Sequence, residues 1–214
     1  MVKIDYPALY RLQDKVLFTV FSVETGFYLT GGTCLHRFYQ EQRYSDDLDL
    51  FSNDSQLFRD DVRLVRRSLV DAGISLDIQV DSRDFVRFIV ENALKVDLVN
   101  DRVYRVGRSI RTGVNIMLDN LNNIGANKIC AVLGRDDPKD VFDLYTLFRS
   151  SNVNWSVITS AAERKCSFDI EELRFRLKSF PLYLLEMLQV TDSEFVSELQ
   201  RDYQLLTNCI LSSD

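Results

Sequence analysis

Two aspartates alternate with leucines in the segment DLDLF at residues 47–51. If this segment is a β-strand, its side chains alternate between two faces, so Asp47 and Asp49 share one face and the leucines share the other. Two carboxylates this close repel each other unless a cation neutralises them, and oxygen ligands of this kind suit Mg²⁺. The pair is therefore a candidate for metal-assisted phosphoryl transfer, and the alternative is a polar strand face that meets water.

A glycine turn precedes this pair. The segment FYLTGG at residues 27–32 is typical of a short strand running into Gly31 and Gly32, where the absence of side chains allows a tight turn and close approach of a ligand. We expect a short helix to follow at once, with Thr33 as its cap and with exposed N–H groups that form a phosphate site. This order of elements places a phosphate cradle beside a metal site.

The ordering resembles the nucleotidyltransferase superfamily of the DNA polymerase beta type, and more closely the AbiEii/AbiGii toxin family. Four segments over roughly residues 25–150 carry the resemblance. They are the GGT turn at residues 31–33, RYSDDLD with Arg43, Ser45, Asp47 and Asp49, ANKICAVLGR with Lys128 and Arg135, and KDVFDLY with Asp140 and Asp143. Four segments in the expected order are more specific than any one of them.

The resemblance implies an α+β fold with a nucleotidyltransferase-type mixed β-sheet flanked by helices, followed by a C-terminal helical region. We expect a catalytic core over residues 1–116. Residues 117–214 would form the helical region, packed on the core and completing the active site. The activity implied is transfer of a nucleoside monophosphate from an NTP to an acceptor hydroxyl, with pyrophosphate leaving.

The resemblance also assigns the metal ligands. Asp47 and Asp49 would hold Mg²⁺ or Mn²⁺ together with a third acid on a later strand. Asp97 is the favoured third acid, and Asp77 is the alternative. For either residue, the competing interpretation is a polar strand face.

The remaining site residues are expected to act on the nucleotide. Gly31, Gly32 and Thr33 would cradle the β- and γ-phosphates, while Lys128 and Arg43 would offset their charge. Without the resemblance, a lone lysine on a helix is a solvated surface residue.

Two further assignments concern the acceptor side and the aspartate strand. Ser45 would either bond a phosphate or brace the strand that carries the aspartates. Asp140 would orient or deprotonate the acceptor hydroxyl, with Asp143 as the alternative. Because Asp140 and Asp143 lie three residues apart, both can face the same side of one helix.

The implied partners are RNA, with tRNA 3′ ends as the leading acceptor, and a separately encoded antitoxin of a type IV toxin–antitoxin or abortive-infection system. Two alternatives remain. One is nucleotidyl transfer to a protein or to a small molecule such as an antibiotic, and the other is a catalytically silent nucleotide-binding module. The formal charge of −6 argues against indiscriminate nucleic-acid binding but leaves room for local contacts, for example through the basic segment at residues 102–111.

Composition agrees with a cytoplasmic enzyme. The 214 residues are 46% hydrophobic, without a run long enough to cross a membrane and without the apolar core of a signal peptide. The four cysteines show no metal-ligand spacing, and we expect them to be reduced thiols. His36 is the only histidine, which disfavours a His-dependent triad, and we expect it to be structural.

The spacing of apolar residues predicts the elements that position these segments. A first helix should start near Asp5 and end near Gly26, and a second should cover residues 55–73 and stop at Gly73. Three strands should follow, of which the first and third alternate strictly, at residues 74–80, 85–91 and 94–99. From Met117 onward the chain should be nearly all helical, with helices at residues 118–134, 138–150, 155–165, 169–180 and 191–211.

Overall fold

The computed structural model describes residues 4–212. It divides into two compact units, each built from several stretches of chain. Unit 1 comprises Met1–Cys34, Ser45–Arg102 and Ser109–Asp119, and unit 2 comprises Leu35–Tyr44, Val103–Arg108 and Asn120–Asp214. The sequence suggested one division after residue 116, whereas these units interleave along the chain.

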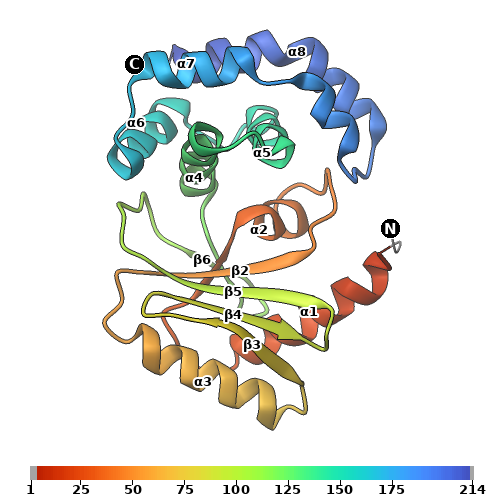
Figure 1. The fold of residues 1–214 in the computed structure, drawn as a ribbon, viewed down its shortest axis with the longest axis vertical. Helices are drawn as coiled ribbons and strands as arrows, with labels where there is room; N and C mark the ends of the chain where they lie inside the picture. Colours follow the sequence, from red (N-terminus) through yellow and green to blue (C-terminus); the bar gives the residue numbers. More distant parts are fainter. Residues whose placement is uncertain (1–3, 213–214) are drawn as a thin grey trace. The chain divides into compact units, whose positions relative to one another are not determined.

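Unit 1 is built on a mixed seven-stranded sheet with the order β3-β4-β5-β2-β1-β7-β6 (Figure 1). The β2–β5 and β1–β7 pairs are parallel and the other four pairs are antiparallel. The mixed sheet confirms the expected fold class. The strands are β1 (Tyr28–Thr30), β2 (Asp47–Asn53), β3 (Leu76–Asp81), β4 (Phe85–Val90), β5 (Leu94–Asp101), β6 (Ile110–Arg111) and β7 (Met117–Leu118).

Helices α1 (Tyr6–Val20) and α3 (Phe58–Asp71) pack against each other in unit 1, and α1 also contacts β5. The Asp5 side chain caps α1 by accepting a hydrogen bond from the N–H of Ala8 at 3.0 Å, as expected for a helix that starts there. Each helix buries one apolar face, with Val16 and Leu17 on α1 and Val65 and Leu69 on α3. The inward side chains of the sheet are also buried and include Leu48, Leu50, Val86, Phe88, Val96 and Leu98. Burial of this apolar surface stabilises the sheet.

Several expected boundaries in unit 1 were wrong. Helix α1 ends at Val20 rather than near Gly26, because the following residues turn toward β1 and the N–H of Gly26 donates to Asp61 Oδ2 at 3.0 Å. Helix α2 (Gly31–Phe38) begins at Gly31, so Thr33 lies inside the helix and does not cap it. Residues 117–118 form strand β7 rather than the start of a helical run.

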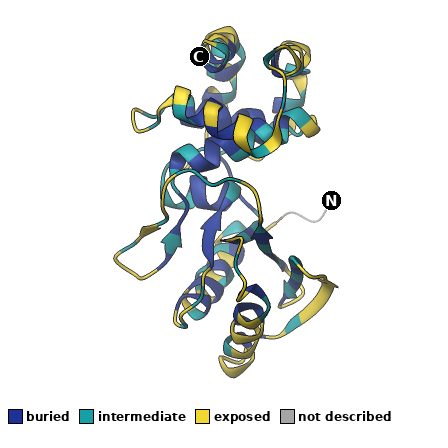
Figure 2. Cartoon of the chain, turned by 90° about the vertical axis from the view of Figure 1, so that its left-hand side faces the viewer, coloured by how far each residue is buried: buried dark blue, intermediate teal, exposed yellow. Residues whose placement is uncertain are grey.

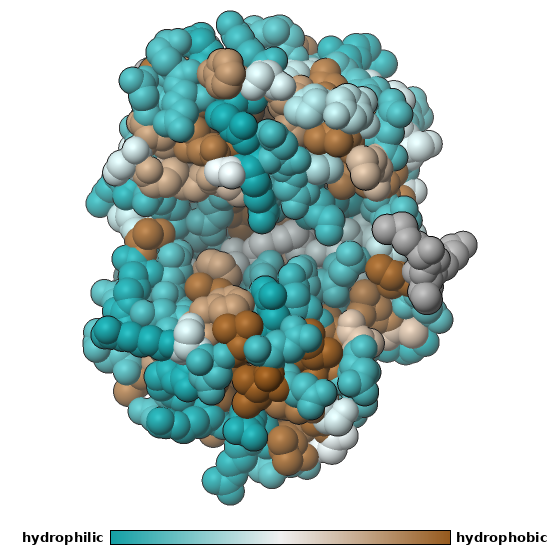
Figure 3. Space-filling view, viewed as in Figure 1, coloured by the Kyte–Doolittle hydropathy of each residue, from teal (hydrophilic) through white to brown (hydrophobic). Residues whose placement is uncertain are grey.

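Strand β3 differs from the half-buried strand that its alternation predicted. Five of its six residues are exposed, since β3 is the edge strand and pairs only with β4. Ile78 and Val80 are both exposed, and hydrophobic side chains are visible on this side of unit 1 in Figure 3. Among β3, β4 and β5, the strand whose burial alternates strictly is β4, which the sequence pattern had not singled out.

Unit 2 is helical, and its helices match the predicted spans closely. They are α4 (Leu121–Gly134), α5 (Pro138–Phe148), α6 (Trp155–Cys166), α7 (Ile170–Ser179) and α8 (Ser193–Leu211), with a 3-10 helix η1 (Leu182–Met187) that was not expected. Each of the five α-helices is capped at its start by an Asn or Asp side chain. Most residues of α5 are buried, and Figure 2 shows helices with both buried and exposed residues. Phe142 and Tyr145 of α5 pack against Phe195 of α8, with ring centroids 5.2 and 5.0 Å apart.

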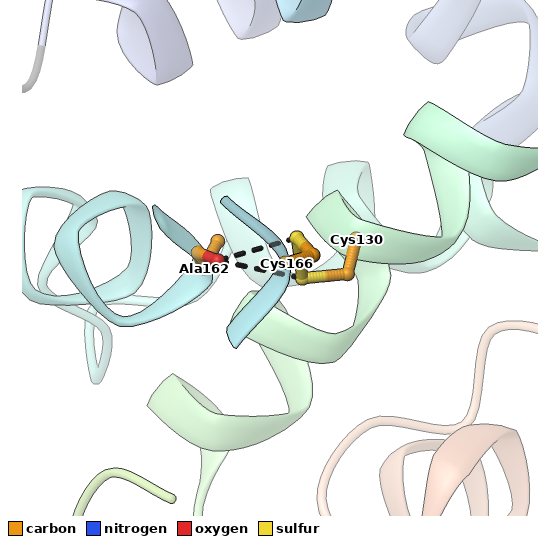
Figure 4. Close-up of a disulfide and its surroundings, with 3 residues drawn as sticks. All are labelled: Cys130, Ala162 and Cys166. Atoms are coloured by element: carbon orange, nitrogen blue, oxygen red, sulfur yellow. Dashed lines mark hydrogen bonds between the residues drawn. A yellow bond between two sulfur atoms is a disulfide. The ribbon is translucent and has the colours of Figure 1, made fainter. Parts of the chain in front are cut away.

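A disulfide joins α4 to α6 through Cys130 and Cys166 (Figure 4). The carbonyl oxygen of Ala162 lies 3.6 Å from Cys130 Sγ and 3.2 Å from Cys166 Sγ. Cys34 and Cys209 take no part in a disulfide. The expectation of four reduced cysteines was therefore wrong for one pair, because helix packing brings together two residues that are 36 positions apart.

None of the helices within residues 4–212 is both long enough and apolar enough to cross a bilayer.

Candidate active site

The two aspartates of β2 lie on one face of the sheet in unit 1. Leu48 and Leu50 point to the opposite face and are fully buried, whereas Asp47 and Asp49 are partly exposed. Strand β5 runs parallel to β2 in a register that sets Asp97 beside Asp49. Three carboxylates thus come from two adjacent strands.

Gly31 is required for the position of Asp49. Its φ angle is +70°, a conformation that L side chains rarely adopt, and a Cβ atom at this position would collide with Asp49 Oδ2. The first turn of α2 therefore approaches the Asp49 carboxylate as closely as a glycine allows. This geometry joins the glycine turn and the aspartate strand into one local arrangement.

Cations on the neighbouring strands neutralise the carboxylates. Lys95 Nζ lies 2.7 Å from Asp47 Oδ2 and 3.9 Å from Asp97 Oδ2. Arg87 of β4 binds Asp97 with two parallel hydrogen bonds, from Nε at 2.7 Å and from a terminal nitrogen at 2.8 Å. Neither cation was predicted as a site residue, although both lie on predicted strands. Their partners depend on strand register, which the sequence does not give.

These ion pairs shift the titration of the two cations. Hydrogen bonding to Asp97 raises the pKa of Arg87, with the carboxylates of Asp47 and Asp49 adding to the effect. Burial alone would lower the pKa of Lys95, but Asp47 outweighs it and the pKa is raised. Both side chains therefore stay charged beside the acids.

Among residues 4–212 no group of three or more His, Cys, Asp or Glu side chains has the geometry of a metal site. The donor chemistry nevertheless suits a hard divalent cation at Asp47 and Asp49, which share a face and are partly exposed. Asp97 is different, because both of its oxygens are bound by Arg87. Asp77 lies on the edge strand β3, separated from β2 by β4 and β5.

Thr33 and Ser45 are buried and bonded within unit 1. Thr33 Oγ1 lies 2.7 Å from Ser45 Oγ and donates to the carbonyl oxygen of Asp47 at 2.5 Å. The N–H of Ser45 donates to the Tyr10 hydroxyl at 3.2 Å, and its carbonyl accepts from Gln13 Nε2 at 3.0 Å. These bonds fix the start of the aspartate strand, which corresponds to the bracing role considered for Ser45.

Unit 2 contains a second cluster of charged residues, on α4 and α5. Lys128 Nζ of α4 lies 2.8 Å from Asp140 Oδ1 and 2.7 Å from Asp143 Oδ2. Arg135 also binds Asp140, through Nε at 2.7 Å. Asp140 and Asp143 are fully buried, as their three-residue spacing on an inward-facing helix permits. The structure therefore brings together Lys128 and both candidate bases within unit 2.

Arg43 and His36 complete this cluster. Arg43 is 3% exposed and binds Asp143 through Nε at 2.7 Å and a terminal nitrogen at 2.9 Å. His36 Nε2 lies 2.7 Å from Asp143 Oδ1, and Nδ1 lies 3.0 Å from the carbonyl oxygen of Gln40. Burial lowers the pKa of His36, although Asp143 and the carbonyl of Gln40 act in the opposite direction. The histidine is a buried partner of Asp143, consistent with the structural role expected for it.

The cluster holds both aspartates ionised. Burial alone would raise the pKa of Asp143, but Arg43, Lys128 and His36 hold it well below its ordinary value of 3.8. Burial opposes the same shift at Asp140, where Lys128 and Arg135 lower the pKa. Burial would lower the pKa of Lys128, but Asp143 and Asp140 raise it. The cations Arg43, Lys128 and Arg135 face Asp140 and Asp143. Arg135 also lies 3.9 Å from Asp137, so three cations are matched by three carboxylates.

The mixed sheet and the aspartate pair beside a glycine turn together define a nucleotidyltransferase fold. JHP933 from Helicobacter pylori has a similar structure, with a TM-score of 0.62, 18% identity and coverage of 99% of this chain and 96% of that chain. MenT4, nucleotidyltransferase toxin Rv2826c from Mycobacterium tuberculosis H37Rv, has a TM-score of 0.64, 15% identity and coverage of 96% and 88%. At these identities the likeness shows the fold alone.

Sequence comparison gives the family. No curated protein matches the chain significantly. The profile described as "Nucleotidyl transferase AbiEii toxin, Type IV TA system" matches residues 15–212, so the chain belongs to the AbiEii nucleotidyl transferase toxin family. This confirms the resemblance inferred from the GGT turn and the RYSDDLD stretch. The chain is therefore a nucleotidyltransferase that uses an NTP, and its family implies an antitoxin partner.

Proposed function

We propose that this nucleotidyltransferase moves a nucleoside monophosphate from an NTP to a hydroxyl of RNA, with a tRNA 3′ end as acceptor and Mg²⁺ as the metal. The observation that carries the proposal is the Asp47/Asp49 pair on one sheet face, packed against the Gly31 turn. Support for an RNA acceptor comes from the resemblance to the toxin family.

Asp47 and Asp49 are the residues that would hold the metal. A bound divalent cation would supply neutralisation of the charge that develops on the phosphates. Lys95 lies 2.7 Å from Asp47 Oδ2 and would compete with the metal for the charge of that carboxylate. Asp97, bound by Arg87, would orient the guanidinium beside the site and would join the ligands only if Arg87 withdrew.

The phosphate-binding roles would fall to the start of α2 and to the cations. Gly31 and Gly32 present backbone N–H groups at a helix N-terminus, where anions are favoured. Thr33 supports this turn through its bond to Asp47 and would act by position rather than by direct contact. Lys128 would offset phosphate charge, whereas Arg43 would act mainly by holding Asp143.

Asp140 is the proposed partner of the acceptor hydroxyl, with Asp143 as the alternative. Efficient general bases have pKa values near the working pH, but cations lower the pKa of both aspartates. An ionised, fixed carboxylate orients a hydroxyl well by accepting its hydrogen bond. We therefore propose orientation rather than deprotonation as the main role of Asp140.

The test is incubation of the purified protein with each α-labelled NTP, Mg²⁺ and total cellular RNA, with separate recovery of RNA, protein and small-molecule fractions. The proposal predicts label in RNA, released by nuclease from tRNA 3′ ends. Label in the protein or small-molecule fraction would show that the acceptor is a protein or a small molecule and not RNA. NTP binding without any label transfer would indicate a silent module and would contradict the proposal.

A further inference from the structure

Unit 2 contains a cavity of about 270 Å³ between the loop at residues 103–108 and helix α6. Tyr104 and Val106 line it from the loop, and Ser156, Ser160 and Arg164 line it from the helix. The three helical residues recur at four-residue spacing, so they form one stripe along α6. The residues proposed above for nucleotidyl transfer do not line this cavity.

The cavity combines a cation, hydroxyl groups and an aromatic ring. The guanidinium carbon of Arg164 lies 3.4 Å from the centroid of the Tyr104 ring, which places the two groups in contact. Across residues 4–212, Arg164 forms no ion pair and the Ser160 hydroxyl forms no hydrogen bond. Ser156 Oγ donates to Asn154 Oδ1 at 3.0 Å, so its lone pairs remain available. An unpaired cation beside open hydroxyls favours an anionic ligand with oxygen acceptors.

The charge of the surrounding residues also favours an anionic ligand. Although the chain has a net charge of −6, the loop at residues 103–108 and α6 together carry four basic residues against a single acidic one, Glu163. The basic residues are Arg105, Arg108, Arg164 and Lys165. Local positive charge of this kind attracts phosphate groups even on an acidic protein.

The size of the cavity restricts the ligand. Sites that enclose a whole small molecule occupy roughly 300–1,000 Å³. At about 270 Å³ this cavity fits one part of a larger ligand, such as a single base or phosphate group. Single-stranded RNA offers both groups in every nucleotide, and proteins recognise it by stacking bases on aromatic rings or on arginine planes.

We propose that this cavity binds one nucleotide of the single-stranded part of the RNA acceptor, with Arg164 and Ser160 contacting phosphate and the Tyr104–Arg164 pair stacking on the base. The inference rests on the proposed function, because it assumes that RNA is the acceptor. It adds a substrate-anchoring site on unit 2. A free NTP shares the same chemistry, so the test has to separate the two ligands.

The experiment measures binding of a fluorescent single-stranded oligoribonucleotide of roughly 12 nucleotides to the full-length protein without Mg²⁺ or NTP. Variants Arg164→Gln and Tyr104→Leu are compared with Arg174→Gln, which removes a cation from α7 instead. We expect each cavity variant to weaken RNA binding about five- to tenfold, as for loss of one stacking contact, and the control to bind like the parent. Arg164→Gln should also reduce the slope of log K against log salt by about one.

Matched thermal melts exclude misfolding, and a second titration uses free NTP. Equal RNA affinity in parent and cavity variants would overturn the inference, as would loss of NTP binding with RNA binding intact. The Asp47→Asn variant distinguishes a failure of this inference from a failure of the proposed function. It should abolish transfer and leave RNA affinity unchanged. If the parent binds RNA through the cavity but labels only another acceptor, the cavity assignment survives and the proposed acceptor fails.

Discussion

The strands beside the aspartate pair supply cations to the carboxylates of this sheet face. Lys95 neutralises Asp47 directly, and Arg87 neutralises Asp97 beside Asp49. Carboxylates that share one face would otherwise repel each other. At the scale of single residues, three carboxylates therefore face two cations, which leaves one negative charge that a bound metal would offset.

Replacement of Lys95 tests its competition with the metal. In Lys95→Gln, Asp47 loses its cation, so we expect a lower Tm in EDTA and a larger rise in Tm on adding Mg²⁺ than the parent shows. The measurement is a thermal melt over a Mg²⁺ titration, with Lys178→Gln on α7 as the control. An identical Mg²⁺ response in parent and variant would mean that Lys95 does not compete with the metal.

Gly31 provides a second test at this scale. Gly31→Ala adds a Cβ that collides with Asp49, so we expect unfolding free energy to fall by at least about 1–2 kcal/mol and transfer activity to fall on the order of 100-fold. Gly73→Ala is a matched control, because Gly73 has a φ of +66° but nothing within 4 Å of an added Cβ. It should be strained yet active. Similar activity losses in both variants would contradict the role of the collision.

Among the elements, α4 and α5 are tied together by the buried charges around Asp143. Removing one partner of a buried ion pair leaves a charge without compensation, which costs about 3–5 kcal/mol. We expect this loss of unfolding free energy in Asp143→Asn, measured by chemical denaturation. The exposed Asp60–Arg63 pair supplies the control, since Asp60→Asn should change stability by less than about 1 kcal/mol.

The same pairing fixes the pH dependence of unfolding. Because the pKa of Asp143 is lower in the folded chain than its ordinary value of 3.8, the unfolded state binds its proton first as pH falls. The stabilisation is complete above pH 3.8 and is lost as pH falls from there through the folded pKa. We expect unfolding free energy to drop over this acid range in the parent and less steeply in Asp143→Asn. Equal slopes of unfolding free energy against pH in the parent and the variant would contradict the assignment of this stabilisation to Asp143.

The disulfide between α4 and α6 is a further property of the elements. Its cysteines are 36 residues apart, and closing a loop of this size stabilises a fold by roughly 3–4 kcal/mol in the chain-entropy description. Dithiothreitol should therefore lower the unfolding free energy of the parent by about this amount and leave a Cys130→Ser, Cys166→Ser variant unchanged. Alkylation of all four cysteines in the unreduced, denatured protein would show that the bond does not form.

The helices and long strands could be predicted from the sequence better than the short strands and the partners of the charged side chains. Apolar periodicity located α3 to α8 and strands β3 to β5, because this signal is local. The two-residue strands β6 and β7 gave no signal at that length. The partners of Asp47, Asp97 and Asp143 were also missed, since Lys95, Arg87 and His36 meet them only through strand register or helix packing.

For the molecule as a whole, each of the two units has its own set of candidate residues. Unit 1 contains the aspartate pair and the glycine turn, and unit 2 contains Lys128, Asp140 and the basic cavity on α6. Membership of the AbiEii family makes the chain a nucleotidyltransferase, and the central claim is that Asp47 and Asp49 are the carboxylates on which transfer depends.

The most direct test is the rate of pyrophosphate release and of label incorporation in Asp47→Asn and Asp49→Asn, compared with Asp77→Asn on the exposed edge strand. The account predicts that each β2 variant loses activity by about 100-fold or more while folding normally, and that Asp77→Asn works like the parent. Transfer at the parent rate in both β2 variants, or an equal loss in Asp77→Asn, would contradict it.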